Sequence, residues 1–176
     1  MLCDLRLHPW DKGSMDSSRK ILGRKDLREK LEGHRQRGER IVLTNGCFDM
    51  LHVGHVRYLK AAHEQGDIVV VGVNADSSVG ALKGAGRPIL SEAARAALVA
   101  GLDAVDYVVI FDEPDVEGLL RDLRPDVHAK GTDYTLQTVP ERETSAKLGI
   151  RVAIVGDPKH HSTRDLIARI RERCNA

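Results

Sequence analysis

The chain has 176 residues, of which 41% are hydrophobic and 30% charged, and its formal net charge is +1. This length and composition are typical of a single globular domain with a core of its own. The near-neutral charge excludes the broad basic surface that nucleic-acid or membrane-surface binding requires, so we expect neither partner.

The three cysteines are too few and too widely spaced for a disulfide framework or a paired metal site. The start of the chain carries Asp4 and Arg6 where a signal peptide needs an apolar segment, and no apolar run reaches membrane-spanning length. We therefore expect a cytoplasmic protein. Residues 1–20 lack periodicity and are expected to form a flexible leader before a single domain over residues 21–176.

The predicted elements alternate between helix and strand. After a sparse helix from Arg24 to about Arg37, an apolar run at Ile41–Thr44 predicts the first strand, and the next helix ends near Gln65. The almost uninterrupted apolar run at Ile68–Val73 is typical of a parallel strand covered on both faces. A loop that contains glycines and a lysine is expected at Ala81–Leu90.

The alternation continues to the C-terminus. Ser91 is expected to cap an alanine-rich helix that ends near Ala100. The remaining strands are predicted at Tyr107–Phe111, Asp126–Lys130 and Arg151–Val155, and the remaining helices at Val116–Leu123, Val139–Leu148 and Ser162–Arg173. This pattern predicts a doubly wound, Rossmann-like α/β sheet of about five parallel strands with helices on both faces.

The most informative stretch runs from Ile41 to Leu59. It combines a strand, a turn at Thr44–Gly46 and a helix start with His52 and His55, which share one helix face at a spacing of three. The N–H groups and the dipole of a helix start favour an anion. Two imidazoles add donors for a phosphorus centre whose oxygens gain charge, as nucleotidyl transfer requires. A zinc site completed by a nearby Cys or Asp, and two exposed histidines without a role, are the alternatives.

Further polar residues follow the other strands. Because ligands of an open parallel sheet bind beyond the carboxyl ends of its strands, we expect these residues to converge. Lys83 and Arg87 suit phosphate oxygens, with a solvated surface loop as an equal alternative. The other candidates are Asn74, Lys130, Asp133, Ser162 and Thr163, the last two as helix caps, as phosphate ligands or as both.

Two residues of the turn carry their own alternatives. Asp49 is interpreted as a carboxylate that contacts Mg²⁺ or substrate, with a turn aspartate as the alternative. Cys47 is interpreted as a small packing residue, because no base that would activate it is evident. The sequence lacks G-x-x-x-x-G-K-[ST], which excludes a P-loop NTPase. It also lacks G-x-G-x-x-G after the first strand, which disfavours a dinucleotide-dependent dehydrogenase.

The stretch GCFDMLHVGHVRYL resembles the histidine motif of nucleotidyltransferases of the cytidylyltransferase-like superfamily. The run VVVGVNADSSVGALKGAGRPIL, followed by VDYVVIFDE, PDVHAKGTDY and a closing Ser-Thr pair, is similar to the D-glycero-β-D-manno-heptose-1-phosphate adenylyltransferases. The resemblance covers about Lys25 to Ile170. It implies direct in-line transfer of AMP from ATP to a heptose 1-phosphate, which gives pyrophosphate and ADP-heptose, a lipopolysaccharide core precursor.

The resemblance also implies roles for the matching residues. His52, His55 and Lys83 would be catalytic, and Asp49 and Arg87 would contact the sugar phosphate. The nucleotide would be bound by Thr44, Asn45, Gly46, Cys47, Phe48, Asn74, Arg95, Lys130, Gly131, Asp133, Ser162 and Thr163. Mg²⁺ would be held mainly by the phosphates of ATP, with Asp49 as the one candidate protein ligand. A homodimer is the assembly suggested by analogy of fold, and a separate sugar kinase would supply the heptose 1-phosphate.

Two other functions remain open at this level. One keeps the chemistry but uses CTP with glycerol 3-phosphate or a similar phosphate ester. The other is a nucleotide-binding module without catalytic activity.

Overall fold

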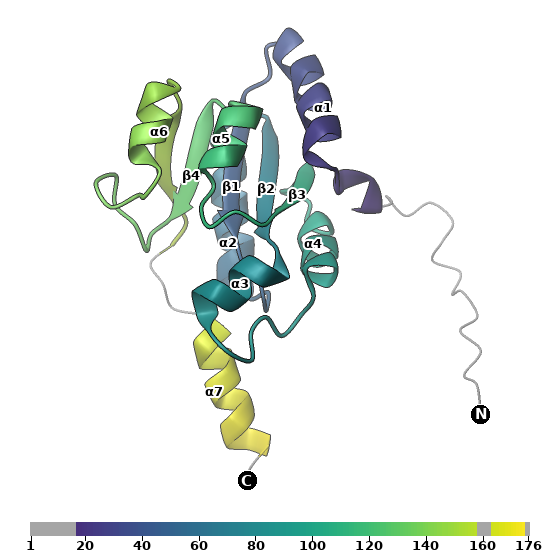
Figure 1. Ribbon diagram of the computed structural model, residues 1–176, viewed down its shortest axis with the longest axis vertical. Coiled ribbons are helices and arrows are strands. Elements are labelled where there is room, and N and C mark those ends of the chain that lie inside the picture. Colours follow the sequence, from purple (N-terminus) through teal and green to yellow (C-terminus); the bar gives the residue numbers. More distant parts are fainter. Residues whose placement is uncertain (1–16, 158–162, 175–176) are drawn as a thin grey trace, which may run out of the picture.

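The computed structural model describes residues 17–157 and 163–174. Within these ranges the chain forms a five-stranded sheet in the order β3-β2-β1-β4-β5, with every neighbouring pair parallel (Figure 1). The strands are β1 (Ile41–Gly46), β2 (Ile68–Asn74), β3 (Tyr107–Phe111), β4 (Val127–Gly131) and β5 (Arg151–Val155). The predicted doubly wound parallel sheet is confirmed.

Helices connect successive strands. They are α1 (Arg24–Gln36) before β1, α2 (Val53–His63) between β1 and β2, α3 (Asp76–Lys83) and α4 (Glu92–Ala100) between β2 and β3, α5 (Glu117–Leu123) before β4, α6 (Arg142–Lys147) before β5 and α7 (Thr163–Cys174) after it. None of the helices in the described ranges is both long and apolar enough to span a membrane.

The sheet is covered on both faces, which explains why its strands are apolar at successive positions. In β1, Ile41 and Leu43 belong to a hydrophobic cluster with side chains of α1 and α5, whereas Val42 belongs to a second cluster with side chains of α2 and α4. All seven residues of β2 are buried. Figure 1 shows α5 in front of the sheet and α2 behind it. Both layers leave the strand ends accessible, and the polar residues gather there.

The structure corrects the prediction for the segment between β2 and α4. Asp76–Lys83 forms helix α3, where the sequence predicts a strand end and a loop. The backbone N–H of Asp76 donates to the Glu92 carboxylate at 2.8 Å, and Arg95 donates to the Asp76 carboxylate at 2.7 Å. These partners lie 16 and 19 residues further along the chain, so the local pattern does not reveal them. Lys83 is the last residue of a helix, and the glycine-containing loop begins after it.

Smaller differences concern element ends, which are the least reliable part of any such prediction. β1 continues through Asn45 and Gly46, and α6 begins at Arg142 instead of Val139. Of the predicted leader, Ser17–Lys20 forms a 3-10 helix, η2, in which the Lys20 amine donates to the carbonyl of Val105 at 2.7 Å. Residues 1–16 of that leader lie outside the described residues.

Strand β4 carries a histidine that is buried without a hydrogen-bond partner. His128 is 0% exposed, and neither ring nitrogen is hydrogen-bonded. Burial, and to a lesser extent the charge of Lys130, lowers the pKa of His128 to about 3. The ring is therefore neutral in the folded protein at any pH near 7.

We predict that His128 reduces the stability of the protein as the pH falls below about 6.5, where an imidazole in the unfolded chain takes up its proton. The folded protein takes up this proton only near pH 3, so between these values the unfolded state binds more protons and gains stability. Urea unfolding at pH 7 and pH 5 measures the effect. His128→Leu should lose about 2 kcal/mol less free energy of unfolding over this interval than the wild type. Parallel pH dependences of the two proteins would contradict the prediction.

Candidate active site

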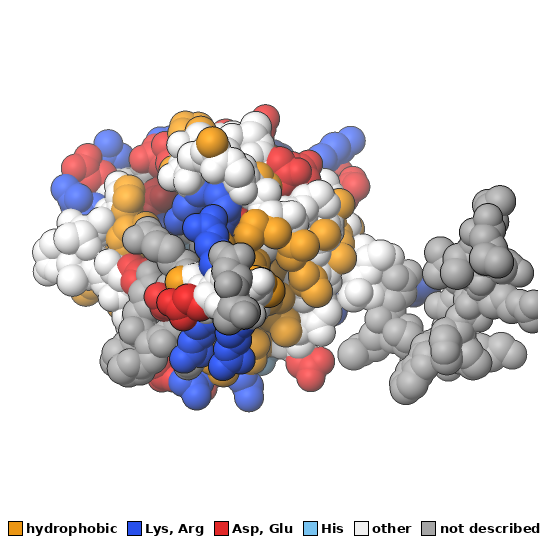
Figure 2. Space-filling view, turned by 90° about the horizontal axis from the view of Figure 1, so that it is seen from below, with side chains coloured by type: hydrophobic (Ala, Val, Ile, Leu, Met, Phe, Trp, Pro, Cys, Tyr) orange, Lys and Arg blue, Asp and Glu red, His pale blue; other side chains and the backbone are white. Residues whose placement is uncertain are grey.

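A pocket of about 920 Å³ opens at the carboxyl ends of β1 and β4, the two strands between which the winding direction of the sheet reverses. Open α/β sheets bind ligands at this switch point, and the volume is in the range of small-molecule sites. Figure 2 looks onto this end of the molecule and shows Lys and Arg side chains beside a hydrophobic area. Most of the predicted site residues line the pocket: Asn45, Gly46, Cys47, Phe48, Asp49, His52, His55, Asn74, Lys83, Arg87, Lys130, Gly131, Asp133 and Thr163.

The two histidines build the start of α2. His52 is the N-cap residue, and its Nδ1 accepts a hydrogen bond from the backbone N–H of Gly54 at 3.1 Å. The backbone N–H of His52 donates in turn to Nδ1 of His55 at 3.4 Å, and the two rings stack with centroids 3.9 Å apart. Because Nδ1 is the acceptor in both contacts, a neutral ring carries its proton on Nε2. Nε2 is therefore the donor atom of each histidine.

The turn between β1 and α2 is shaped by Gly46 and Phe48. Phe48 has a φ of 48°, in the left-handed region that residues other than glycine rarely adopt. Its buried ring lies 5.2 Å from the ring of His55, and a Cβ at Gly46 would stand 3.1 Å from the Phe48 ring. A backbone conformation of this kind costs about 1–3 kcal/mol and persists only where the surroundings hold it. Here the packing of Phe48 holds it and supports the His55 ring.

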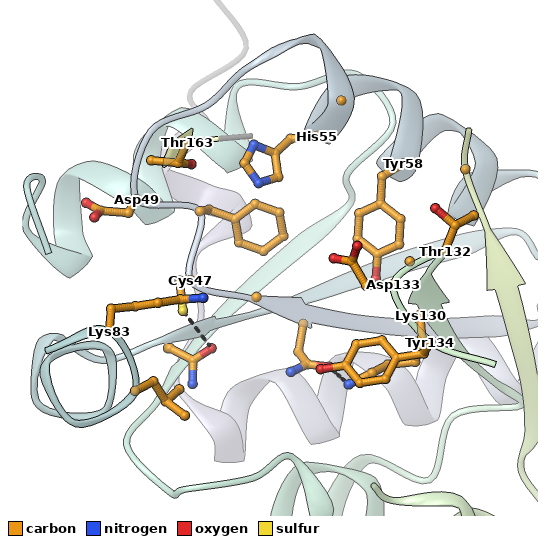
Figure 3. Close-up of a pocket in the computed structure, with 18 of the residues that line it drawn as sticks. Cys47, Asp49, His55, Tyr58, Lys83, Lys130, Thr132, Asp133, Tyr134 and Thr163 are labelled. Carbon is orange, nitrogen blue, oxygen red and sulfur yellow. Dashed lines mark hydrogen bonds between the residues drawn. The ribbon is translucent and has the colours of Figure 1, made fainter. Parts of the chain in front are cut away.

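Two lysines flank the histidine turn. Lys83 ends α3, which follows β2, and Lys130 lies in β4, so they approach from opposite sides of β1 (Figure 3). The ammonium of Lys130 lies 3.3 Å from Asn45 Oδ1, 3.4 Å from a carboxylate oxygen of Glu141 and 4.9 Å from the centre of the Tyr134 ring. Burial lowers the pKa of Lys130, and the Glu141 carboxylate acts in the opposite direction.

The carboxylate of Asp49 is bonded within the protein. Its Oδ1 accepts hydrogen bonds from the backbone N–H groups of Ile89, at 2.6 Å, and Leu90, at 3.0 Å, and its Oδ2 accepts from the Arg87 guanidinium. Burial alone would raise the pKa of Asp49, but these hydrogen bonds outweigh it and hold the pKa below its usual value. Asp49 thus ties the loop before α4 to the histidine turn and keeps Arg87 at the pocket wall.

Two of the predicted nucleotide contacts, Arg95 and Thr44, do not line the pocket. Arg95 is 0% exposed and donates to the carbonyls of Leu90, at 3.0 Å, and Cys47, at 2.6 Å, as well as to Asp76. Thr44 is buried as well, and its hydroxyl bonds the hydroxyl of Tyr58. Both residues support the wall of the pocket from inside the protein. Ser162 lies outside the described residues.

Two further features of the site are the protonation state of Cys47 and the grouping of the side chains that could bind a metal ion. Burial raises the pKa of the Cys47 thiol, so the side chain is protonated at neutral pH and is no activated nucleophile. Its Sγ lies 4.0 Å from Asn74 Oδ1 (Figure 3). In the part of the chain that the structure describes, no three His, Cys, Asp or Glu side chains are grouped to hold a metal ion.

The lining residues also include several that the sequence does not suggest as candidates, among them Tyr58 and Glu141. Tyr58 continues the spacing of three that His52 and His55 begin, and its hydroxyl donates to the carbonyl of Ala129 in β4 at 3.0 Å. This spacing is a signal in the sequence from which Tyr58 could have been predicted as a site residue. Glu141 precedes the short helix α6, and only the folded chain brings it to Lys130.

The comparisons with known proteins agree with this geometry. The family described as cytidylyltransferase-like matches residues 43–173. The chain is 45% identical over 160 residues to the bifunctional protein HldE of Syntrophotalea carbinolica and 48% identical over 157 residues to HldE of Pseudomonas paraeruginosa. These alignments cover 91% and 89% of this chain but 33% of each relative, so the chain spans about a third of the length of the curated relatives it matches.

A solved structure shares the fold. The crystal structure of the lipopolysaccharide core biosynthesis protein from Thermoplasma volcanium superposes with a TM-score of 0.59 at 30% identity. It covers 69% of this chain and 100% of that chain. The chain belongs to the cytidylyltransferase-like family, the class of nucleotidyltransferase that the switch-point pocket and the histidine turn indicate. Within that family its sequence stands with the HldE proteins.

We predict that Arg95→Met destabilises the protein by about 3 kcal/mol, because the carbonyls of Cys47 and Leu90 lose the guanidinium donor of a fully buried side chain. Arg121→Met is the matched control. Arg121 lies exposed on α5, where it pairs with Glu117, so its loss should change stability by less than about 0.5 kcal/mol. Urea unfolding of the three proteins measures the difference, and equal losses in the two variants would refute the prediction.

Proposed function

We propose that this chain transfers AMP from ATP to a heptose 1-phosphate by direct in-line attack and releases ADP-heptose and pyrophosphate. The observation that carries the proposal is the histidine cap of α2, where both rings accept from the backbone at Nδ1 and therefore carry the proton of the neutral ring on Nε2. The cap lies at the switch point of a parallel sheet, beside two lysines and an arginine.

The proposed reaction makes and breaks one bond at the α-phosphorus of ATP. An oxygen of the sugar phosphate attacks this phosphorus, and the bond to the bridging oxygen of the β-phosphate breaks, so pyrophosphate leaves with the electron pair. Catalysis of such a step is positioning and charge stabilisation. The Nε2–H donors of His52 and His55 would bind the oxygens of the α-phosphate in the transition state, together with the N–H groups of the helix start. The protonated thiol of Cys47 fits a mechanism without a covalent intermediate.

The cations divide between two sides of the histidine turn. We assign Lys83 to the phosphates of the reacting centre and Arg87, oriented by Asp49, to the phosphate of the sugar. On the opposite side Lys130 belongs to the nucleotide half. The proposed nucleotide contacts are Asn45, Gly46, Cys47, Phe48, Asn74, Lys130, Gly131, Asp133, Thr163 and, from the resemblance, Ser162.

Mg²⁺ is proposed to enter with ATP. Both carboxylate oxygens of Asp49 are engaged within the protein, so the phosphate oxygens, with water, fit the ion better than this side chain does. When bound, the ion would neutralise charge on the triphosphate.

The identity of the sugar rests on the resemblance of the loop and strand motifs to the heptose branch. The name of the Thermoplasma volcanium protein, a lipopolysaccharide core biosynthesis protein, supports a product that serves as a precursor of that core. The same proposal includes a sugar kinase activity that supplies the heptose 1-phosphate, a cytoplasmic location and a homodimer.

We predict that pyrophosphate release requires ATP and a heptose 1-phosphate together. The experiment incubates the protein and Mg²⁺ with ATP, CTP or GTP against heptose 1-phosphate, glucose 1-phosphate and glycerol 3-phosphate, and measures pyrophosphate. Release with CTP and glycerol 3-phosphate alone would replace the heptose assignment by the cytidylyltransferase alternative. No release with any pair, despite nucleotide binding, would favour a binding module.

We predict that His55→Asn lowers kcat by at least about 100-fold and leaves ATP binding within about threefold, because Nε2 acts chiefly in the transition state. Asparagine keeps an acceptor near the position of Nδ1, so the cap of α2 is retained. His55→Gln, whose amide reaches the position of Nε2, should recover part of the rate. His63→Asn, at the exposed end of the same helix, is the control. Equal losses of binding and rate in His55→Asn would point to a structural role.

A further inference from the structure

Glu141 carries a buried carboxylate that lies beside Lys130, on the β4 side of the pocket. The residue lines the pocket and is only 4% exposed, and its Oε2 accepts no hydrogen bond. Glu141 is the N-cap residue of α6, yet its side chain makes no capping bond. Oε2 therefore accepts no hydrogen bond from the start of α6 or from the surrounding backbone.

Its nearest charged partner is Lys130. Lys130 Nζ lies 3.4 Å from Glu141 Oε2, an ion pair without hydrogen-bond geometry, and 3.3 Å from Asn45 Oδ1. A buried carboxylate oxygen that accepts no hydrogen bond destabilises a fold, and burying an ion pair rarely stabilises one. A ligand donor that bonds the carboxylate from the pocket would offset this penalty, so the Glu141–Lys130 pair is better suited to the ligand-bound protein.

The pair presents a hydrogen-bond acceptor beside a hydrogen-bond donor. Adenine carries the complementary pattern on its Watson–Crick edge, with the 6-amino group as donor and N1 as acceptor. Cytosine shows the same order with its 4-amino group and N3. Guanine and uracil show the reverse order, with a carbonyl oxygen and a ring N–H. A carboxylate facing a carbonyl oxygen, and an ammonium facing an N–H, are both unfavourable.

We propose that Glu141 and Lys130 together read the Watson–Crick edge of the base, with Glu141 accepting from the exocyclic amino group and Lys130 donating to the adjacent ring nitrogen. This inference rests on the proposed function, since it takes the base of the nucleotide to lie on the β4 side of the pocket. It makes Glu141 a specificity-determining residue for amino bases. The pair separates ATP from GTP and UTP and does not separate ATP from CTP.

The test compares ATP with ITP, which replaces the 6-amino group by an oxygen and makes N1 a donor. Equilibrium binding to the full chain with Mg²⁺, followed by calorimetry, needs no turnover. The wild type should bind ATP about 10- to 100-fold more tightly than ITP, the worth of a charged hydrogen bond. In Glu141→Gln this ratio should fall to about threefold or less, because an amide can either donate or accept.

Two controls separate this reading from others. Glu143→Gln, in the same helix but with its side chain 74% exposed, should keep the wild-type ratio. Binding of dATP tests the rival in which the carboxylate holds the ribose hydroxyls: there, Glu141→Gln would change the ratio of ATP to dATP affinity and leave the ratio of ATP to ITP alone, which would overturn the proposal.

The comparison of ATP with ITP in the wild type tests the inference even if Glu141→Gln does not fold. Equal affinity for ATP and ITP would sink the inference. The binding ratios are independent of the sugar phosphate, so a lack of pyrophosphate release would count against the proposed function without touching the base-reading pair.

Discussion

The pocket depends on one fully buried guanidinium. Arg95 donates to the carbonyls of Cys47 and Leu90 and to the carboxylate of Asp76, and so joins the histidine turn, the loop before α4 and the start of α3. The histidine turn follows β1, whereas the other two segments both lie between β2 and β3. Lys83, at the end of α3, and the histidines of α2 therefore take their relative positions from a side chain that is buried and does not line the pocket.

The two halves of the pocket differ in electrostatic character. On the β2 side, Lys83 and Arg87 add positive charge, and the carboxylate of Asp49 is turned into the protein by its hydrogen bonds. On the β4 side, Lys130 is balanced by Glu141. A phosphate-rich ligand is favoured on the first side, whereas the second suits a neutral group with directional hydrogen bonds. An anionic group and a neutral hydrogen-bonding group would thus be favoured on different sides of the same pocket.

The sheet was predictable from sequence because its physical cause is local. Runs such as Ile68–Val73 are apolar at successive positions only where both faces are covered, and the polar residues after each run mark the strand ends. Helix α3 was not predictable, because contacts from Glu92 and Arg95 hold its first turn. The same limit applies to individual roles. From the sequence, an arginine near a phosphate-binding motif is predicted to bind phosphate, whereas the fold buries Arg95. Glu141 becomes a candidate only because folding brings its carboxylate close to Lys130.

The bonds of Asp49 have a consequence for the entropy of binding. Its carboxylate fixes the backbone at Ile89 and Leu90 and the side chain of Arg87 in the ligand-free chain. The conformational entropy of this loop is therefore lost when the protein folds, and little of it remains to be lost when a ligand arrives. An acceptor phosphate bound to Arg87 as proposed would find the guanidinium already oriented, so more of the electrostatic attraction would be available as affinity.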